Sequence, residues 1–376
     1  MSYETLRLIW WLFLGLLLIG FAVMDGFDLG VAVLLPVIAR SDDERRVLIN
    51  TIGPTWEGNQ VWFVLGGGAI FAAFPLIYAA AFSGFFVALI LVLFALILRP
   101  VGFDYRSKLN DPRWRSLWDS CLFIGGLVPA FLFGVAFGNL LQGVPFRYDE
   151  VLRVHYEGSF LGLLNPFALL VGAVSLSLLV MHGAVFLQLK TVETLRQRAR
   201  RWQGIAALVY VASFALAGIW VAYGIDGYRI ITFGGTAAPS NPLAKSVVVE
   251  AGAWFANFHA RPLLWLVPAA AFAGVFAAWR LAPRRPGIAF VASATAVGAT
   301  ILTAGTAMFP FMLPSSLAPA HSLTLWDSTS SLLTLRWMFC MTVVFLPLIV
   351  CYTGWVFRVM RGPVTLEQVS GSNVHY

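Results

Sequence analysis

The stretch from Ala79 to Leu98 reads AAAFSGFFVALILVLFALIL and contains no charged residue. A helix rises about 1.5 Å per residue, so about 20 apolar residues cross a hydrocarbon core about 30 Å thick. A second uncharged stretch, LIWWLFLGLLL, runs from Leu8 to Leu18 within an apolar segment that continues to Ile38. These stretches predict helices that cross a lipid bilayer.

The composition of the whole chain agrees with this prediction. Of the 376 residues, 59% are hydrophobic and 11% are charged, whereas a soluble surface needs about a quarter charged. The net charge is +7, but the basic residues lie in short segments between apolar runs. That distribution is typical of membrane proteins and argues against a surface for nucleic acid. The apolar run ending at Ile38 is too long for a signal peptide core, so we expect it to remain as the first helix.

Apolar segments long enough to span a membrane predict an all-α polytopic membrane protein with about nine transmembrane helices, formed by residues 1–376 as a single membrane domain. The predicted helices cover residues 6–38, 58–74, 77–98, 119–141, 163–189, 203–224, 263–280, 287–309 and 333–358. The longest connection, 225–262, contains Gly, Pro and Asn. We expect it to be an ordered external loop with a short helix at about Val247 to Phe258.

The boundary at Phe74, Pro75 and Leu76 is the least defined, because no polar residue marks it and one kinked helix is an alternative. The basic residues favour two helices. With nine helices and an external N terminus, 18 of the 25 Lys and Arg residues lie on one side. Joining the two helices would place the first two basic loops on opposite sides. Because basic loops face the cytoplasm, the C terminus is predicted to be cytoplasmic.

Glycines repeat at a spacing of four residues in two predicted helices. One pair is Gly26 and Gly30, and the other is Gly134 and Gly138. This spacing lets two membrane helices approach closely. We interpret all four as helix-packing positions.

Three acidic residues fall near one end of the first two predicted helices. Asp25 and Asp28 are three residues apart, so both project from one helix face, and Glu57 begins the next helix at the same level. Burying an ionisable group at membrane depth costs free energy, so such groups often have a function. Three converging carboxylates are therefore a candidate entrance to a proton pathway. The alternative is structural, because acids near helix ends reach interfacial water and Glu57 suits a helix N terminus.

Other polar residues have simpler interpretations. Three acids in or beside a basic loop are predicted to be solvated ion partners: Asp104, Asp111 and Asp119. The three cysteines include no CxxC pair and are interpreted as small apolar fillers, without a disulfide or metal site: Cys121, Cys340 and Cys351.

His182 is the only histidine inside a predicted helix. The commonest b-type heme site needs two, so we predict that this chain binds no heme by itself and that His182 is a hydrogen-bonded core residue. The sequence contains no GxxxxGK[ST], no HExxH and no nucleophile elbow. The residues therefore give no basis for soluble catalysis.

Several long strings resemble subunit II of the cytochrome bd ubiquinol oxidases. They include IWWLFLGLLLIGFAVMDGFDLGVAVL from Ile9, PTWEGNQVW from Pro54 and RPVGFDYRSK from Arg99. The resemblance continues through FGNLLQGVPF from Phe137, AGAWFANF from Ala251 and ILTAGTAMFPFMLPSS from Ile301, and it covers nearly the whole chain.

This resemblance implies two four-helix bundles plus a peripheral helix, in a bacterial inner membrane with the N terminus in the periplasm. It implies a heme-free subunit that pairs with subunit I, which holds two b-type hemes, heme d and the quinol site. The complex oxidises quinol and reduces O2 to water with protons from the cytoplasm. A small single-helix accessory subunit is usual in the family, and some members carry a structural quinone in subunit II.

The resemblance also assigns roles to individual residues. It implies that Glu57, Asp25 and Asp28 contribute to a proton route toward heme d. The family often has Asp where this chain has Glu57, which moves the carboxylate by one methylene. Trp62 is similar to a residue near an oxygen-access tunnel, with a packing role as the alternative.

Two other functions are considered. A secondary transporter of a small solute would suit many helices with internal glycines, but the discontinuous helices of two related halves are not found in the sequence. A purely scaffolding subunit is the other alternative. Oxygen consumption by a Glu57→Gln complex distinguishes a scaffold from a subunit that supplies a proton group.

Overall fold

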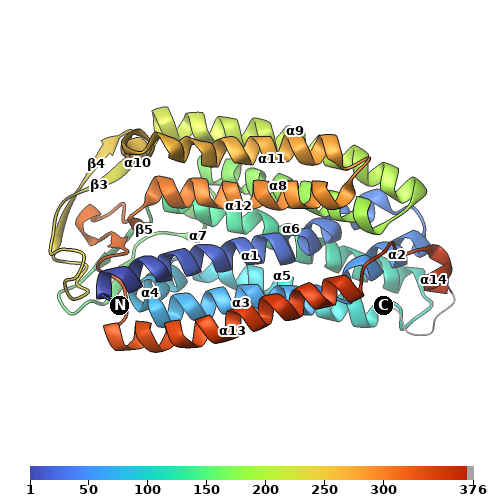
Figure 1. Cartoon of the computed structure of the whole chain (residues 1–376), viewed down its shortest axis with the longest axis horizontal. Helices are drawn as coiled ribbons and strands as arrows, with labels where there is room; N and C mark the ends of the chain where they lie inside the picture. Colours follow the sequence, from blue (N-terminus) through green and yellow to red (C-terminus); the bar gives the residue numbers. More distant parts are fainter. Residues whose placement is uncertain (371–376) are drawn as a thin grey trace.

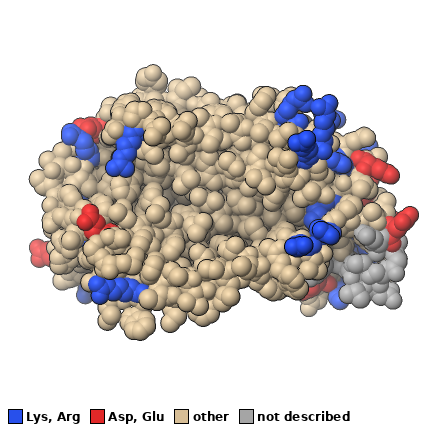
Figure 2. Space-filling view, viewed as in Figure 1, with Lys and Arg blue, Asp and Glu red and all other residues tan. Residues whose placement is uncertain are grey.

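The computed structural model describes residues 1–370. Its long helices run side by side along the long axis of the molecule (Figure 1). Within the described residues, eight helices are long and apolar enough to cross a membrane, and a bent pair brings the number to as many as nine. Charged side chains on the face shown in Figure 2 lie toward its two ends and leave the middle free of charge. The predicted polytopic all-α fold is therefore confirmed.

The helices form two bundles. The first contains α1 (Tyr3–Ile38), α3 (Trp56–Ala73), α5 (Phe86–Tyr105) and α6 (Pro112–Gln142). The second contains α8 (Pro166–Lys190), α9 (Glu193–Gly224), α11 (Leu266–Leu281) and α12 (Pro286–Met308). Helices α1 and α6 pack against α8 and so join the bundles. Helix α13 (Leu332–Val359) lies at the edge against α1 and α3 with most of its surface exposed (Figure 1). This is the predicted arrangement of two four-helix bundles plus a peripheral helix.

The chain bends sharply between the second and third predicted helices. Helix α4 (Pro75–Gly84) follows α3 directly, and their axes differ by 119°. The bend lies at Phe74, where the proline ring of the next residue opposes a continued helix. A further break at Phe85 separates α4 from α5. The predicted helix 77–98 is thus two helices rather than one.

Several helices extend beyond the apolar windows that predicted them. Helix α5 continues to Tyr105, α6 starts at Pro112 and α9 starts at Glu193. Backbone hydrogen bonding does not stop where the hydrocarbon core ends, and Arg, Lys and Gln are good helix formers. The charged residues that ended each window therefore lie on helices.

A short amphipathic helix between the first two spans was not predicted. Helix α2 (Asp42–Ile52) has three acids in its first turn, and the Ser41 hydroxyl accepts a hydrogen bond from the Glu44 N–H. Acids in a first turn stabilise a helix N terminus, while Val47, Leu48 and Ile52 are buried. Helix α14 (Leu366–Ser370) packs beside it. We call this end of the molecule the α2 end and the opposite end, which carries the N terminus, the β3 end.

The β3 end carries the long connection between α9 and α11 (Figure 1). Strands β3 (Asp226–Phe233) and β4 (Lys245–Ala251) form an antiparallel hairpin, followed by η1 (Ala253–Phe255), α10 (Ala256–Ala260) and η2 (Pro262–Trp265). The predicted helix from Val247 to Phe258 is therefore wrong over its first half. Residues 247–249 are all valine, whose branched side chains favour a strand.

The remaining elements are short. Strand β1 (Phe146–Tyr148) pairs with β2 (Val154–Tyr156), and β5 (Phe311–Leu313) pairs with β6 (Leu323–Thr324). Helices α7 (Phe160–Leu163) and η3 (Pro319–His321) lie in the connections.

All four glycines predicted to pack helices face α8: Gly26, Gly30, Gly134 and Gly138. The closest approach is at Gly30, where an added methyl group would lie 2.1 Å from the Leu179 carbonyl oxygen. Gly183 of α8 faces the same point, and a methyl group there would lie 2.7 Å from the Gly30 carbonyl carbon. Only glycine allows the α1 and α8 backbones to come this close.

Candidate functional site

A buried ion pair lies inside the first bundle, toward the α2 end of α1. The Arg99 guanidinium of α5 donates two hydrogen bonds to Asp25 of α1, with Nη1–Oδ2 at 3.0 Å and Nη2–Oδ1 at 2.7 Å. The side chains are 1% and 0% exposed. The Arg99 guanidinium also lies 5.9 Å from the Trp56 ring centroid. This bidentate geometry gives Asp25 a full counter-charge at membrane depth.

Asp28, one helical turn further along α1, is equally buried but has a neutral partner. Its Oδ2 accepts a hydrogen bond from Asn59 Nδ2 of α3 at 2.8 Å. Within residues 1–370, its Oδ1 is buried and has no hydrogen-bond partner. One guanidinium therefore stands beside two buried carboxyl groups. In an apolar interior a second uncompensated negative charge is costly, so this geometry favours a proton on Asp28.

Glu57 does not join the two aspartates. Its side chain is exposed in the first turn of α3, and none of the described ion pairs or hydrogen bonds links it to Asp25 or Asp28. Residues two apart on a helix point about 200° apart. Because Asn59 faces Asp28, Glu57 must point away from it. The predicted convergence of three carboxylates is therefore wrong, and the carboxylates divide into a buried pair and a surface acid.

Two partners in this site, Arg99 and Asn59, are not among the residues predicted from the sequence. The predicted helix ends at residue 98, one residue before Arg99, although α5 continues to Tyr105. Asn59 carries no charge, so a search for ionisable residues in the membrane helices does not find it. Its position two residues after Glu57 was the available clue, because it places an amide on the opposite side of the same helix turn.

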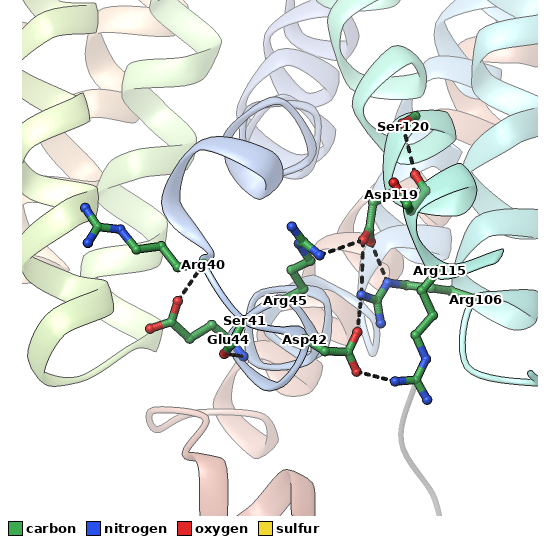
Figure 3. Close-up of polar contacts among 10 residues, drawn as sticks. Arg40, Ser41, Asp42, Glu44, Arg45, Arg106, Arg115, Asp119 and Ser120 are labelled. Atoms are coloured by element: carbon green, nitrogen blue, oxygen red, sulfur yellow. Dashed lines mark hydrogen bonds and ion pairs between the residues drawn. The ribbon is translucent and has the colours of Figure 1, made fainter. Parts of the chain in front are cut away.

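A second polar cluster closes the α2 end of the first bundle (Figure 3). Arg106 donates to Asp119 of α6 and, through Nη2 at 2.7 Å, to Asp42 of α2. Arg115 Nη1 donates to the other Asp42 oxygen at 2.8 Å, and Arg45 Nη1 lies 3.5 Å from Asp119. These contacts fasten α2 across the ends of α5 and α6.

The structure corrects the prediction for one of the three acids that were expected to be solvated. Asp119 is buried and ion-paired rather than solvated. Asp111 is exposed and caps α6, where its Oδ1 accepts a hydrogen bond from the Arg113 N–H at 2.8 Å. Asp104 is exposed near the end of α5.

His182 of α8 has both ring nitrogens engaged, one by α12 of the second bundle and one by α1 of the first. Its Nδ1 lies 2.8 Å from the Ser293 hydroxyl and its Nε2 lies 2.9 Å from the Val23 carbonyl oxygen. The ring also stacks on Phe290. His182 is therefore the hydrogen-bonded core residue that was predicted.

No metal-binding cluster is found in the described chain. Among residues 1–370, no group of three or more His, Cys, Asp or Glu side chains is arranged to hold a metal ion. The three cysteines are free, and Cys340 and Cys351 are exposed on α13 rather than packed in the core.

Trp62 lies buried between α3 and α1. A methyl group added at Gly20 would lie 2.5 Å from the Trp62 ring, so the glycine gives the indole its place against α1. Phe21, Leu179 and Val92 belong to the same apolar cluster. The contacts of Trp62 in this chain are thus those of a packed core side chain.

A large apolar cavity of about 610 Å³ lies between the bundles. Its walls come from both bundles, mainly from α1, α6, α8, α9 and α12, and it extends to η1 and α10. Aromatic side chains line much of it: Phe137, Phe167, Phe214, Trp265 and Phe272. Such a cavity suits a hydrocarbon chain rather than a polar ligand.

Comparison with known proteins gives the site a family context. Residues 6–360 match the sequence model for cytochrome bd terminal oxidase subunit II. The chain belongs to this family. As a cytochrome bd subunit II it is part of an oxidoreductase complex, a ubiquinol oxidase, and has a subunit I as its partner. Nothing in the comparisons supports the transporter alternative.

Individual relatives agree along the full length. The chain is 53% identical to cytochrome bd-I ubiquinol oxidase subunit 2 of Escherichia coli K12, covering 100% of this chain and 99% of the relative. It is 54% identical to a probable cytochrome oxidase subunit 2 of Haemophilus influenzae, covering 96% of each, and 31% identical to the Bacillus subtilis subunit 2.

A solved structure of the bd oxidase from Geobacillus thermodenitrificans shares the fold. The TM-score is 0.71 at 17% identity, covering 94% of this chain and 98% of that chain. The two chains thus share their fold although most of their side chains differ.

Proposed function

We propose that this cytochrome bd subunit II supplies proton-carrying groups to the oxidase through Glu57 and Asp28, with Asp25 as a positioning residue. The observation that carries the proposal is the unequal environment of the two buried acids. Arg99 holds Asp25, while Asp28 has only the Asn59 amide and one carboxyl oxygen without a partner among the described residues. A carboxyl group held by a cation stays ionised, whereas one without a cation can take up a proton at lower cost.

Glu57 supports the same proposal from the surface of the chain. It lies at the start of an exposed stripe on α3 that includes Val61 and Val64. An acid at the edge of an apolar helix face fits a contact with another protein better than a contact with lipid. We propose that this face meets subunit I, so that Glu57 lies at the boundary between the two subunits.

The test is quinol-driven oxygen consumption by the assembled complex, together with its heme spectrum. We expect Asp28→Asn and Glu57→Gln complexes to keep their hemes and lose most of their turnover, because each replacement keeps the shape and removes the proton. Glu57→Asp should restore much of the turnover. Full activity in both amide variants would show that the subunit acts as a scaffold. The matched control is Asp104→Asn, an exposed acid at the same end of the bundle.

The proposed membrane orientation follows from the same end of the molecule. We place the α2 end in the cytoplasm and the N terminus in the periplasm of a bacterial inner membrane. The basic residues of the α1–α3, α5–α6, α8–α9 and α11–α12 connections all gather at the α2 end, which supports this orientation. Labelling of introduced cysteines with a membrane-impermeant reagent tests it.

We propose that the hemes, two of b type and one heme d, belong to subunit I. In this chain both nitrogens of His182 are already bonded, which fits a subunit that offers no axial ligand from its membrane helices. The family resemblance alone supports a small single-helix accessory subunit. The heme spectrum of the complex before and after separation of the subunits tests the heme assignment.

We propose that the cavity between the bundles holds the prenyl tail of a structural quinone. Its aromatic and aliphatic walls fit an apolar chain, and the buried polar groups at its edge are few. Extraction and mass spectrometry of the purified complex should find quinone, and a bulky Ala304→Trp replacement in the cavity wall should lower the amount of bound quinone.

For Trp62 the proposed role near an O2 path rests on resemblance. Its test is the O2 affinity of a Trp62→Phe complex.

A further inference from the structure

Six arginines of the second bundle gather at the α2 end without an acidic partner among the described residues. They lie at the start of α9 and around the α11–α12 connection: Arg196, Arg200, Arg201, Arg280, Arg284 and Arg285. Among residues 1–370 none of them forms an ion pair, whereas Arg45, Arg106, Arg115 and Arg198 at the same end all do. We call these six residues the α9–α11 rim.

The fold brings the two halves of this rim together. Arg196 Nη2 of α9 donates to the Pro283 carbonyl oxygen in the α11–α12 connection at 3.2 Å. Two turns further along α9, a methyl group on Gly204 would lie 3.7 Å from the Trp279 indole nitrogen of α11. Residues 196, 200 and 204 share one face of α9, so Arg200 lies between these two contacts. Figure 2 shows basic side chains gathered at the corresponding part of the surface.

The surroundings of the rim indicate the chemistry of its partner. Trp279 is 49% exposed and lies one residue before Arg280. Further toward the middle of the molecule the surface is apolar, with Leu208 of α9 at 72% exposure and Phe276 of α11 at 64%. Guanidinium groups bind phosphate with two parallel hydrogen bonds, and Trp is favoured at the boundary between headgroups and hydrocarbon. A charged rim above an exposed apolar surface fits an amphiphile.

We propose that the α9–α11 rim binds the phosphate of an acidic phospholipid, whose acyl chains lie along α9 and α11 beside Leu208 and Phe276. Free phosphate would use the arginines but not the apolar surface. The rim faces away from the first bundle, because α9 and α11 pack on α8 and on α12. The site therefore belongs to the second bundle and not to the buried acids. This proposal uses the membrane orientation of the proposed function but not the proton route.

The experiment is electron paramagnetic resonance of spin-labelled phosphatidylglycerol with the whole complex in phosphatidylcholine nanodiscs. The readout is the affinity of the motionally restricted lipid relative to spin-labelled phosphatidylcholine. We expect Arg200→Gln/Arg284→Gln to weaken this relative affinity roughly tenfold or more, since each basic residue near an anionic headgroup adds about a further factor of five. The control is Arg113→Gln/Arg361→Gln, which removes two exposed arginines from the same end.

Two outcomes would overturn the proposal. Equal weakening in the control would show a general charge effect without a site. Full displacement of the labelled lipid by glycerol phosphate would show that the apolar surface contributes nothing. The lipid readout does not depend on oxygen consumption. If labelling placed Arg285→Cys in the periplasm, the orientation would fail while the measured lipid affinity still decided whether the rim is a site.

Discussion

The Asp25 carboxylate and the Arg99 guanidinium form a bidentate ion pair that joins α1 to α5 inside the first bundle. Both side chains are almost fully buried. Breaking a buried pair by removing one partner leaves an uncompensated charge, whereas removing both charges together is often tolerated. The pair therefore fixes the position of α5 relative to the helix that carries Asp28.

This relationship predicts strong coupling between the two residues. We expect Asp25→Asn to destabilise the assembled complex by about 3–5 kcal/mol, because Arg99 keeps its charge without a partner. The double variant Asp25→Asn/Arg99→Gln should recover a large part of that loss. Thermal unfolding of the purified complexes, with heme content as a second readout, measures the coupling. Equal melting temperatures for the single and double variants would contradict the prediction.

The contact between α1 and α8 predicts a stability effect at Gly30. A methyl group there would lie 2.1 Å from the Leu179 carbonyl oxygen, so Gly30→Ala must push two backbones apart. We expect a loss of about 1–3 kcal/mol, the usual range for overpacking. The control is Gly15→Ala in the same helix, where nothing lies within 4 Å of the added methyl group. That variant should be neutral or gain up to about 1 kcal/mol from helix propensity.

Glu44 predicts a pH-dependent stability at the α2 end. Partial burial raises the pKa of its carboxyl, but hydrogen bonds from the Arg40 N–H and the Arg198 guanidinium outweigh that effect and the pKa is lowered. A depressed carboxyl pKa adds stability above the unfolded value, which is 4.5, and this stability is lost as pH falls through the folded value. Glu44→Gln should therefore lower the melting temperature at neutral pH and make less difference in acid. If the difference in melting temperature between wild type and Glu44→Gln stayed constant with pH, the carboxyl of Glu44 would not be the group responsible.

The membrane helices were predictable because hydrocarbon thickness sets a length that apolar runs must reach. Their ends were not, since α5 and α9 extend beyond the last apolar residue of each window. Helix α2 is 11 residues long and mostly polar, so a search for apolar spans cannot find it. The β3–β4 hairpin was missed because a long loop with glycine and proline gives no span signal, although its three consecutive valines favour a strand.

The site was predictable only in part for a similar reason. The spacing of Asp25 and Asp28 placed both on one helix face, and the structure buries both. The partner of each comes from another helix, 74 and 31 residues away, and no local pattern contains that information. The outward position of Glu57 follows from its spacing to Asn59 only once Asn59 is known to face Asp28.

A second buried pair, at the β3 end, predicts a stability effect that depends on pH in the alkaline range. Lys245 Nζ of β4 lies 2.9 Å from Asp327 Oδ2 and donates to the Pro242 carbonyl oxygen at 2.7 Å. Burial lowers the pKa of Lys245, and Asp327 partly opposes that shift. Removing the carboxylate charge in Asp327→Asn should depress the pKa further and loosen the β3–β4 hairpin by about 3–5 kcal/mol.

The sign of the pH effect follows from the direction of this shift. An ammonium group whose folded pKa is depressed costs stability while it is protonated, so stability rises with pH between the folded value and the unfolded value of 10.5. The stability that Asp327→Asn loses relative to wild type should therefore be largest near neutral pH and become smaller toward alkaline pH. The rate of protease cleavage in the loop between β3 and β4 measures it, with Asp226→Asn as an exposed control on the same hairpin. Faster cleavage at alkaline pH in Asp327→Asn would show that Lys245 does not carry a buried charge.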